Sequence, residues 1–255
     1  MDTVVLAVER GSPIVGFVDA LGRLGREGMP RSAVVGGVAV MCRLATAHRP
    51  TADIDAVVRD DAVPSAAEML VAQGATRTTT GVDLGGVRID LLEVGDVPTP
   101  ADLPDDQLDR AFVTGHAWAL ATAEPVNVIA RSMRGGTLAS AEVDLATPAS
   151  LVAMKLHAIR KRREARLVKR GSDAYDIYRL LALLDADGSI GVVLRQAPAG
   201  LGEWCASEVE AHFTVDAERT LLWIGNALAS GTVFVVADDL RAVGAAFVLG
   251  VRDTS

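Results

Sequence analysis

A glycine pair, Gly36-Gly37, ends one short apolar run, and Asp53-Ile54-Asp55 opens a second, β-branched run. Alternate residues of a strand project to the same face, so a strand that begins at Asp53 presents Asp53 and Asp55 side by side. Adjacent carboxylates repel each other unless a cation lies between them. Hard divalent cations such as Mg²⁺ bind oxygen clusters of this kind and keep positions free for phosphate oxygens. The segment therefore predicts a glycine turn beside an acidic strand.

A third carboxylate, Asp90, lies in another strand-like run, Val87–Leu92. Alternation puts Arg88 and Asp90 on the same face of that strand. Three aspartates on neighbouring strands can hold two metal ions for an in-line phosphoryl displacement. The Asp-x-Asp pattern alone is not specific, because it recurs at 185–187, where it is typical of a helix end and turn. A cap of a strand or helix is the structural alternative for Asp53.

The chain mixes short strands with helices through about residue 146 and is predicted to be helical afterwards. We expect an α/β (α+β) fold, with a mixed sheet and flanking helices over residues 1–146 and a helical domain over residues 147–255. Strands are expected at 33–35, 54–58, 75–84, 86–94, 126–131 and 137–143. Helices are expected at 13–28, 38–47, 64–74, 149–166, 173–184, 189–196, 202–213, 216–229 and 238–248, and a loop at 97–109.

Composition excludes several classes of protein. The net charge is −8, which argues against unspecific nucleic-acid binding over the whole surface. No run of 18 apolar residues indicates a membrane span, and the acidic start does not fit a signal peptide. The two cysteines, Cys42 and Cys205, are far apart, and we expect a cytoplasmic protein with reduced thiols. The histidines show no zinc-binding spacing.

Lys155 stands out in the predicted helix over 149–166, because it lies within the apolar stripe formed by Leu151, Leu156 and Ile159. A lysine there either extends its amino group to solvent or contacts an anion, and a triphosphate or an aspartate would be suitable. Asp173 and Asp176 follow at helical spacing. They are either a helix cap and a surface acid, or a second acidic element near the nucleotide.

A basic run follows Lys155 and places seven cations in eleven residues, 160–170. A solvated helix face is the simpler interpretation. The functional interpretation is a surface that contacts the phosphates of RNA. The residues predicted for this role are Arg160, Arg162, Arg163, Arg166 and Lys169.

Together these motifs resemble the polymerase-β-like nucleotidyltransferase superfamily and, within it, the AbiEii/AbiGii-type minimal nucleotidyltransferase toxins. The resemblance covers roughly residues 30–185. It rests on Gly36-Gly37, on the segment Arg49–Asp55, on Asp90 in Val-Arg-Ile-Asp-Leu-Leu, on Thr147–Ala158, which resembles TPxxLxxxKLxA, and on Asp173-x-x-Asp176, which resembles the end of KDxxDI. The chain departs from the family pattern at Gly37, where a serine is common, and at Ser172, which replaces a lysine.

The resemblance implies an enzyme that transfers a nucleotide from a nucleoside triphosphate with Mg²⁺ or Mn²⁺ as cofactor. It implies four catalytic residues, Asp53, Asp55, Asp90 and Lys155. The three aspartates would also bind the metal, and Lys155 would also contact the triphosphate. The other nucleotide-binding residues that it implies are Gly36, Gly37, Arg49, Thr51, Asp173 and Asp176. The 3′ end of tRNA is the implied acceptor, and an antitoxin is the implied protein partner. The alternatives are transfer to a protein or small molecule, or a non-catalytic nucleotide-binding module.

Overall fold

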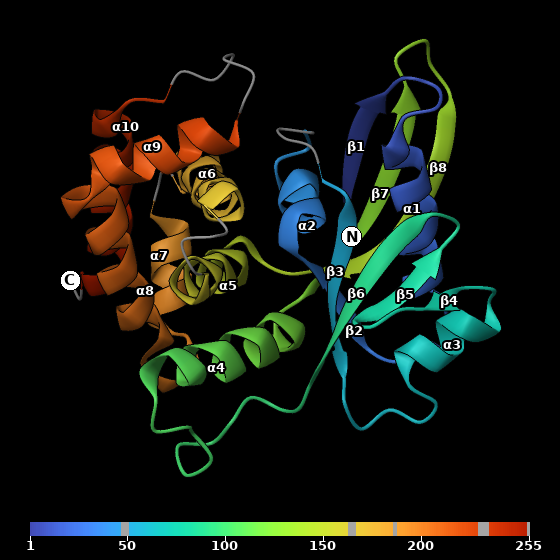
Figure 1. Cartoon of the computed structure of the whole chain (residues 1–255), viewed down its shortest axis with the longest axis horizontal. Coiled ribbons are helices and arrows are strands. Elements are labelled where there is room, and N and C mark those ends of the chain that lie inside the picture. Colours follow the sequence, from blue (N-terminus) through green and yellow to red (C-terminus); the bar gives the residue numbers. More distant parts are fainter. Residues whose placement is uncertain (47–50, 163–166, 186–187, 229–234, 254–255) are drawn as a thin grey trace. The chain divides into compact units, whose positions relative to one another are not determined.

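The structure, a computed structural model, describes residues 1–46, 51–162, 167–185, 188–228 and 235–253. Contacts group the chain into two compact units, which are considered separately (Figure 1). The sheet unit comprises Met1–Asp96 and Ala119–Thr147, and the helical unit comprises Val97–Trp118 and Pro148–Ser255. The segment Val97–Trp118 thus groups with the carboxyl-terminal helices although it lies within the first half of the sequence.

The sheet unit contains one eight-stranded mixed sheet in the order β1-β7-β8-β2-β3-β6-β5-β4. The pairs β1–β7, β2–β8 and β3–β6 are parallel, and the other neighbours are antiparallel. The strands are β1 (Asp2–Val8), β2 (Ser32–Val35), β3 (Asp53–Arg59), β4 (Thr76–Arg77), β5 (Gly81–Leu84), β6 (Val87–Val94), β7 (Glu124–Ser132) and β8 (Thr137–Leu145).

Three helices of the sheet unit, α1 (Pro13–Leu24), α2 (Gly36–Arg43) and α3 (Ala66–Ala72), are interspersed with these strands. Ser12 caps α1 by accepting a hydrogen bond from the Ile14 amide, and Pro13 occupies the first turn, where its missing N–H has no cost. The apolar stripe of α1 is buried and packs against β8. Ser65 and Glu68 form a reciprocal capping box at the start of α3.

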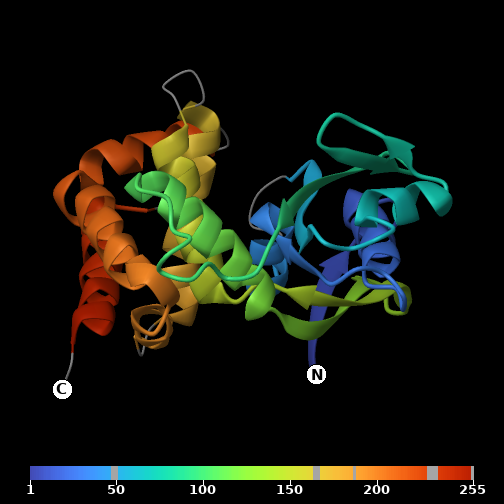
Figure 2. The ribbon, with the colours of Figure 1, turned by 90° about the horizontal axis from the view of Figure 1, so that it is seen from below.

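The helical unit contains helices and no strand among its described residues (Figure 2). Helix α4 (Gln107–Ala121) belongs to it through Trp118. The others are α5 (Pro148–Lys161), α6 (Leu167–Leu184), α7 (Ser189–Arg195), the 3₁₀ turn η2 (Pro198–Gly200), α8 (Leu201–Val209), the π-helical segment η3 (Glu210–Val215), α9 (Ala217–Ala227) and α10 (Ala237–Arg252).

Aromatic side chains form the centre of the helical unit, where Tyr175, Phe213 and Phe247 are fully buried. The same unit buries two histidines, His116 on α4 and His157 on α5. The centroids of their rings are 6.0 Å apart. Burial lowers the pKa of His157 to about 4, and the charge of His116 acts in the same direction. Burial also lowers the pKa of His116, so both histidines are neutral at pH 7.

The predicted mixed α/β fold is confirmed, and five of the six predicted strands match an observed one to within a few residues. The strand predicted at 75–84 is instead two short strands, β4 and β5, because the chain turns at 78–80 between them. Strand β1 and helix α4 were not predicted. The predicted helix over 202–213 continues instead through a π-helical segment after Val209. The end of the predicted helix 149–166 lies partly outside the described residues. No helix among the described residues has the length and hydropathy needed to cross a membrane.

Candidate active site

Strand β3 carries the first two predicted metal ligands at its start. Its residues alternate there, so that Ile54 and Ala56 are buried while Asp53 and Asp55 are half-buried on the other face. On one side β3 pairs with β2, where Val35 lies opposite Asp55. The apolar face of β3 fixes the strand in the core, and its alternation presents both carboxylates together.

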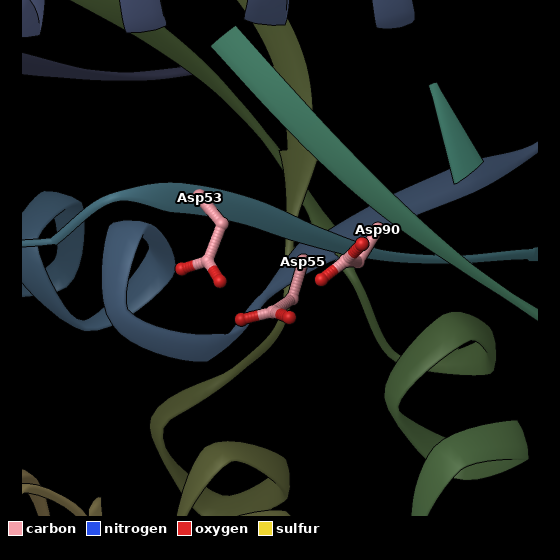
Figure 3. Close-up of side chains that lie close together, drawn as sticks. All are labelled: Asp53, Asp55 and Asp90. Carbon is pink, nitrogen blue, oxygen red and sulfur yellow. The ribbon is translucent and has the colours of Figure 1, made fainter. Parts of the chain in front are cut away.

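Strand β6 runs parallel to β3 on its other side and supplies the third carboxylate. The register places Asp55 opposite Asp90 and Asp53 opposite Arg88. These four side chains form a two-by-two block on one face, because directly paired residues of neighbouring strands share a face. Carboxylate oxygens of the three aspartates lie within 4.8 Å of one another. Figure 3 shows the three side chains converging from their two strands.

The turn from β2 into α2 approaches this acidic block through Gly36. Its φ of +67° lies in the left-handed region, which glycine adopts without strain. A Cβ atom at Gly36 would lie 2.0 Å from Oδ2 of Asp55, well inside van der Waals contact. Gly36 therefore serves two needs at once, the turn and the close approach of backbone to a carboxylate. Gly37 follows in the first turn of α2 and is buried.

Two further side chains surround Asp90. Arg88 donates from Nε to Oδ1 of Asp90 at 2.8 Å and from Nη2 to Oγ1 of Thr80 at 2.9 Å. The Thr80 hydroxyl donates in turn to the same Asp90 oxygen. The hydrogen bond to Asp90 raises the pKa of the Arg88 guanidinium above its ordinary value, and the charges of Asp53 and Asp55 add to this effect.

The arrangement fits a hard divalent cation. Mg²⁺ binds oxygen at about 2.0–2.1 Å, so two of its ligands lie at most about 4.2 Å apart. The observed spread of up to 4.8 Å between the carboxylate oxygens is close to this value. The side chains are half-buried, which leaves room for water or phosphate oxygens as further ligands. The donor set contains oxygen only, as Mg²⁺ and Mn²⁺ prefer.

The other residues predicted on the approach to β3 are less defined. Thr51 is half-buried and lies two residues before Asp53, in a segment without regular secondary structure. Arg49 lies outside the described residues. The roles of both residues in nucleotide binding stay predictions.

Lys155 belongs to the helical unit, where it is buried with two acids of α6. Its Nζ lies 3.0 Å from Oδ1 of Asp173 and 2.7 Å from Oδ2 of Asp176. Arg162 Nε lies 2.8 Å from the other Asp173 oxygen, in an ion pair without the angles of a hydrogen bond. The side chains of Lys155, Asp173 and Asp176 are at most 8% exposed. Of the two counter-ions considered for Lys155, the structure shows aspartate, and contact with a triphosphate stays a prediction.

The predicted RNA-binding residues differ in accessibility. Arg160 and Lys169 are exposed, and Arg160 Nε lies 3.3 Å from a carboxylate oxygen of Glu208, whose side chain is 14% exposed. Arg162, in contrast, is only 23% exposed because of its ion pair with Asp173. Arg163 and Arg166 lie outside the described residues. Their role as contacts to RNA stays a prediction.

Comparisons with known proteins agree with these features. Residues 24–217 match the family described as "Nucleotidyl transferase AbiEii toxin, Type IV TA system". The chain is a nucleotidyltransferase. It belongs to the AbiEii toxin family, since the match covers more than half of its length.

A solved structure described as an antigenic nucleotidyltransferase-like protein from Paracoccidioides brasiliensis is also similar. It is 17% identical, with a TM-score of 0.41, and the match covers 82% of this chain and 88% of that one. At this TM-score the likeness supports no argument about the site. Among curated proteins, no sequence matches the chain.

Proposed function

We propose that Asp53, Asp55 and Asp90 bind Mg²⁺ or Mn²⁺ together with a nucleoside triphosphate, and that the enzyme transfers the nucleotidyl group to an acceptor hydroxyl. The observation that supports this proposal most is the close approach of three carboxylates from two paired strands. Such a cluster is unfavourable without a cation. In the reaction, the acceptor oxygen bonds to the α-phosphorus and loses its proton, the bond to the β-phosphate breaks, and pyrophosphate leaves.

The residues around the carboxylates have separate tasks in this proposal. A divalent cation, when bound, neutralises charge on the phosphate oxygens. Gly36 and Gly37 let the triphosphate approach the backbone at the start of α2, whose first amides have no side-chain cap. Asp90 has one oxygen engaged by two donors. It therefore suits the role of a fixed ligand better than that of a base for the acceptor hydroxyl.

We propose RNA, and specifically the 3′ end of tRNA, as the acceptor. Support comes from the exposed cations Arg160, Lys161 and Lys169 after the Lys155 helix. Exposed ion pairs contribute only about 0–1 kcal/mol, so Lys161, which pairs with the exposed Asp109, can exchange this partner for a phosphate at little cost. Because the family is described as a toxin, we add a cognate antitoxin to the proposed partners. We also propose a cytoplasmic location, where thiols such as the free Cys42 and Cys205 stay reduced.

The proposal is tested by incubating the protein with each labelled nucleoside triphosphate, Mg²⁺ and total RNA. We expect pyrophosphate release and label in RNA of tRNA length, and loss of both on addition of EDTA. Asp53→Asn should abolish transfer, because it removes a charged ligand with little change in volume. Asp19→Asn is the matched control, since Asp19 is an exposed residue of α1 outside the trio. Undiminished transfer by Asp53→Asn would refute the metal site, whereas label in protein would redirect the acceptor.

A further inference from the structure

Thr80, directly before β5, and Arg88, on β6, both form hydrogen bonds to the Asp90 side chain. The hydroxyl of Thr80 and Nε of Arg88 both donate to Oδ1 of Asp90, and Arg88 Nη2 also donates to Thr80 Oγ1. The three side chains thus form a closed triangle of hydrogen bonds. A carboxylate oxygen has two lone pairs, so both acceptor positions of this oxygen are occupied.

The backbone fixes the same triangle. The Thr80 carbonyl accepts a hydrogen bond from the Leu91 amide at 2.9 Å, directly after Asp90. The Thr78 amide donates to the Gly81 carbonyl at 2.9 Å and closes the turn between β4 and β5. A Cβ atom at Gly81 would lie 2.0 Å from the Ile89 carbonyl oxygen, so the absence of a side chain lets β5 approach β6 this closely. These backbone hydrogen bonds therefore fix the position of Thr80 next to Asp90.

The hydrogen bonds found for the Asp90 side chain among the described residues both go to Oδ1, which leaves Oδ2 as the oxygen to offer a metal ion. Figure 3 shows that one of the two Asp90 oxygens is turned towards the Asp55 carboxylate. A carboxylate that has one oxygen saturated by donors offers a metal ion a single oxygen in a single orientation. Mg²⁺ and Mn²⁺ accept such one-oxygen ligands in octahedral geometry, whereas Ca²⁺ takes 6–8 oxygens and often binds both oxygens of a carboxylate.

We propose that Thr80 and Arg88 are positioning residues that restrict Asp90 to one-oxygen coordination and so select Mg²⁺ or Mn²⁺ over Ca²⁺. This inference rests on the proposed function, because it assumes that Asp90 is a metal ligand. Arg88 also compensates part of the negative charge of the trio, since it lies opposite Asp53 in the register. Loss of a partner that orients a metal ligand typically lowers metal affinity about 10–100-fold.

The test measures binding of Mn²⁺ by electron paramagnetic resonance and displacement of Mn²⁺ by Ca²⁺, without nucleotide. Thr80→Val keeps the shape of the side chain and removes its donor. We expect Mn²⁺ to bind at least about tenfold more weakly, with little change for Ca²⁺, so that the preference for Mn²⁺ falls by a similar factor. Arg88→Lys should act in the same direction, because one ammonium cannot replace the two donors of the guanidinium fork.

Controls separate this inference from the proposed function. Thr80→Ser retains the hydroxyl and should keep the wild-type preference, and Thr79→Val changes an exposed neighbour in the same turn. If Thr80→Val binds Mn²⁺ as wild type does, or loses Mn²⁺ and Ca²⁺ equally, the positioning role is wrong while the metal site stands. If wild type binds no Mn²⁺, or Asp53→Asn binds it equally well, the proposed function fails and the inference with it.

Discussion

Replacement of Lys155 by methionine should destabilise the helical unit strongly. Methionine preserves the apolar stem of the side chain but removes the ammonium between Asp173 and Asp176. The side chains of both acids are at most 5% exposed, so water cannot replace the lost partner. Removal of one partner from a buried ion pair typically costs about 3–5 kcal/mol. Arg162 stays on the second Asp173 oxygen, so Asp173 keeps one cation in the variant.

Tryptophan fluorescence can measure the loss of stability in the Lys155→Met variant. The chain has three tryptophans, Trp118, Trp204 and Trp223, and all belong to the helical unit. Urea unfolding followed by their emission therefore reports on the unit that contains Lys155. With a urea dependence of about 2 kcal/mol/M, a loss of 3–5 kcal/mol lowers the midpoint by roughly 1.5–2.5 M.

A matched control and a rescue complete the design. Lys161→Met alters the same helix at a side chain that is 64% exposed and 3.8 Å from Asp109, and should cost at most about 1 kcal/mol. Asp176→Asn in the Lys155→Met background removes the buried negative charge that the ammonium had balanced, and should restore part of the stability. The reasoning is refuted if Lys155→Met is no more destabilising than Lys161→Met, or if the double variant loses the sum of both single effects.

Two more predictions concern the turn at Gly36 and the buried histidines. Gly36→Ala places a Cβ atom 2.0 Å from Asp55 Oδ2 and should abolish Mn²⁺ binding, whereas Gly135→Ala, also at positive φ but with open space, should change only the melting temperature. The pKa of His157, about 4, is below its ordinary 6.5, so its contribution to stability is complete above pH 6.5 and is lost as pH falls towards 4. At about 1.36 kcal/mol per pKa unit the loss is on the order of 3 kcal/mol, and His157→Phe should flatten the urea midpoint against pH between 7 and 4.5. An equally steep profile in the variant would contradict this assignment.

The acidic face was predictable from the sequence because its geometry is local. The two-residue period of a strand fixes that Asp53 and Asp55 share a face, and that Arg88 and Asp90 do so as well. Neither strand sequence alone predicts that β3 pairs with β6. We expected the two strands to be neighbours only because three aspartates beside a glycine turn are typical of a metal site. The positive φ of Gly36 is consistent with the glycine pair that marked this turn.

Features that depend on long-range register were not predictable. Thr80 contacts Asp90 because β5 pairs with β6 in one particular register, and the sequence gives no local signal for it. For Lys155, the apolar stripe indicated an anionic partner but not which one, since the packing of α6 on α5 decides that Asp173 and Asp176 meet it. Strand β1 was not predicted, although its sequence Thr3–Val8 is apolar, because its pairing with β7 joins residues more than 100 positions apart.

The narrow junction within the sheet has a consequence for hydrogen exchange. Strands β2 and β8 pair only at Val34 and Leu145, and the Ala146 amide adds one hydrogen bond to the Val34 carbonyl. Arg43 supports the junction by donating to the carbonyls of Leu145 and Ala146. The three strands β1, β7 and β8 can therefore open as one cooperative group with few broken backbone bonds. Their amides should exchange with deuterium before those of β3 and β6. The carboxylates on β3 and β6 would then keep their geometry while β1, β7 and β8 open locally.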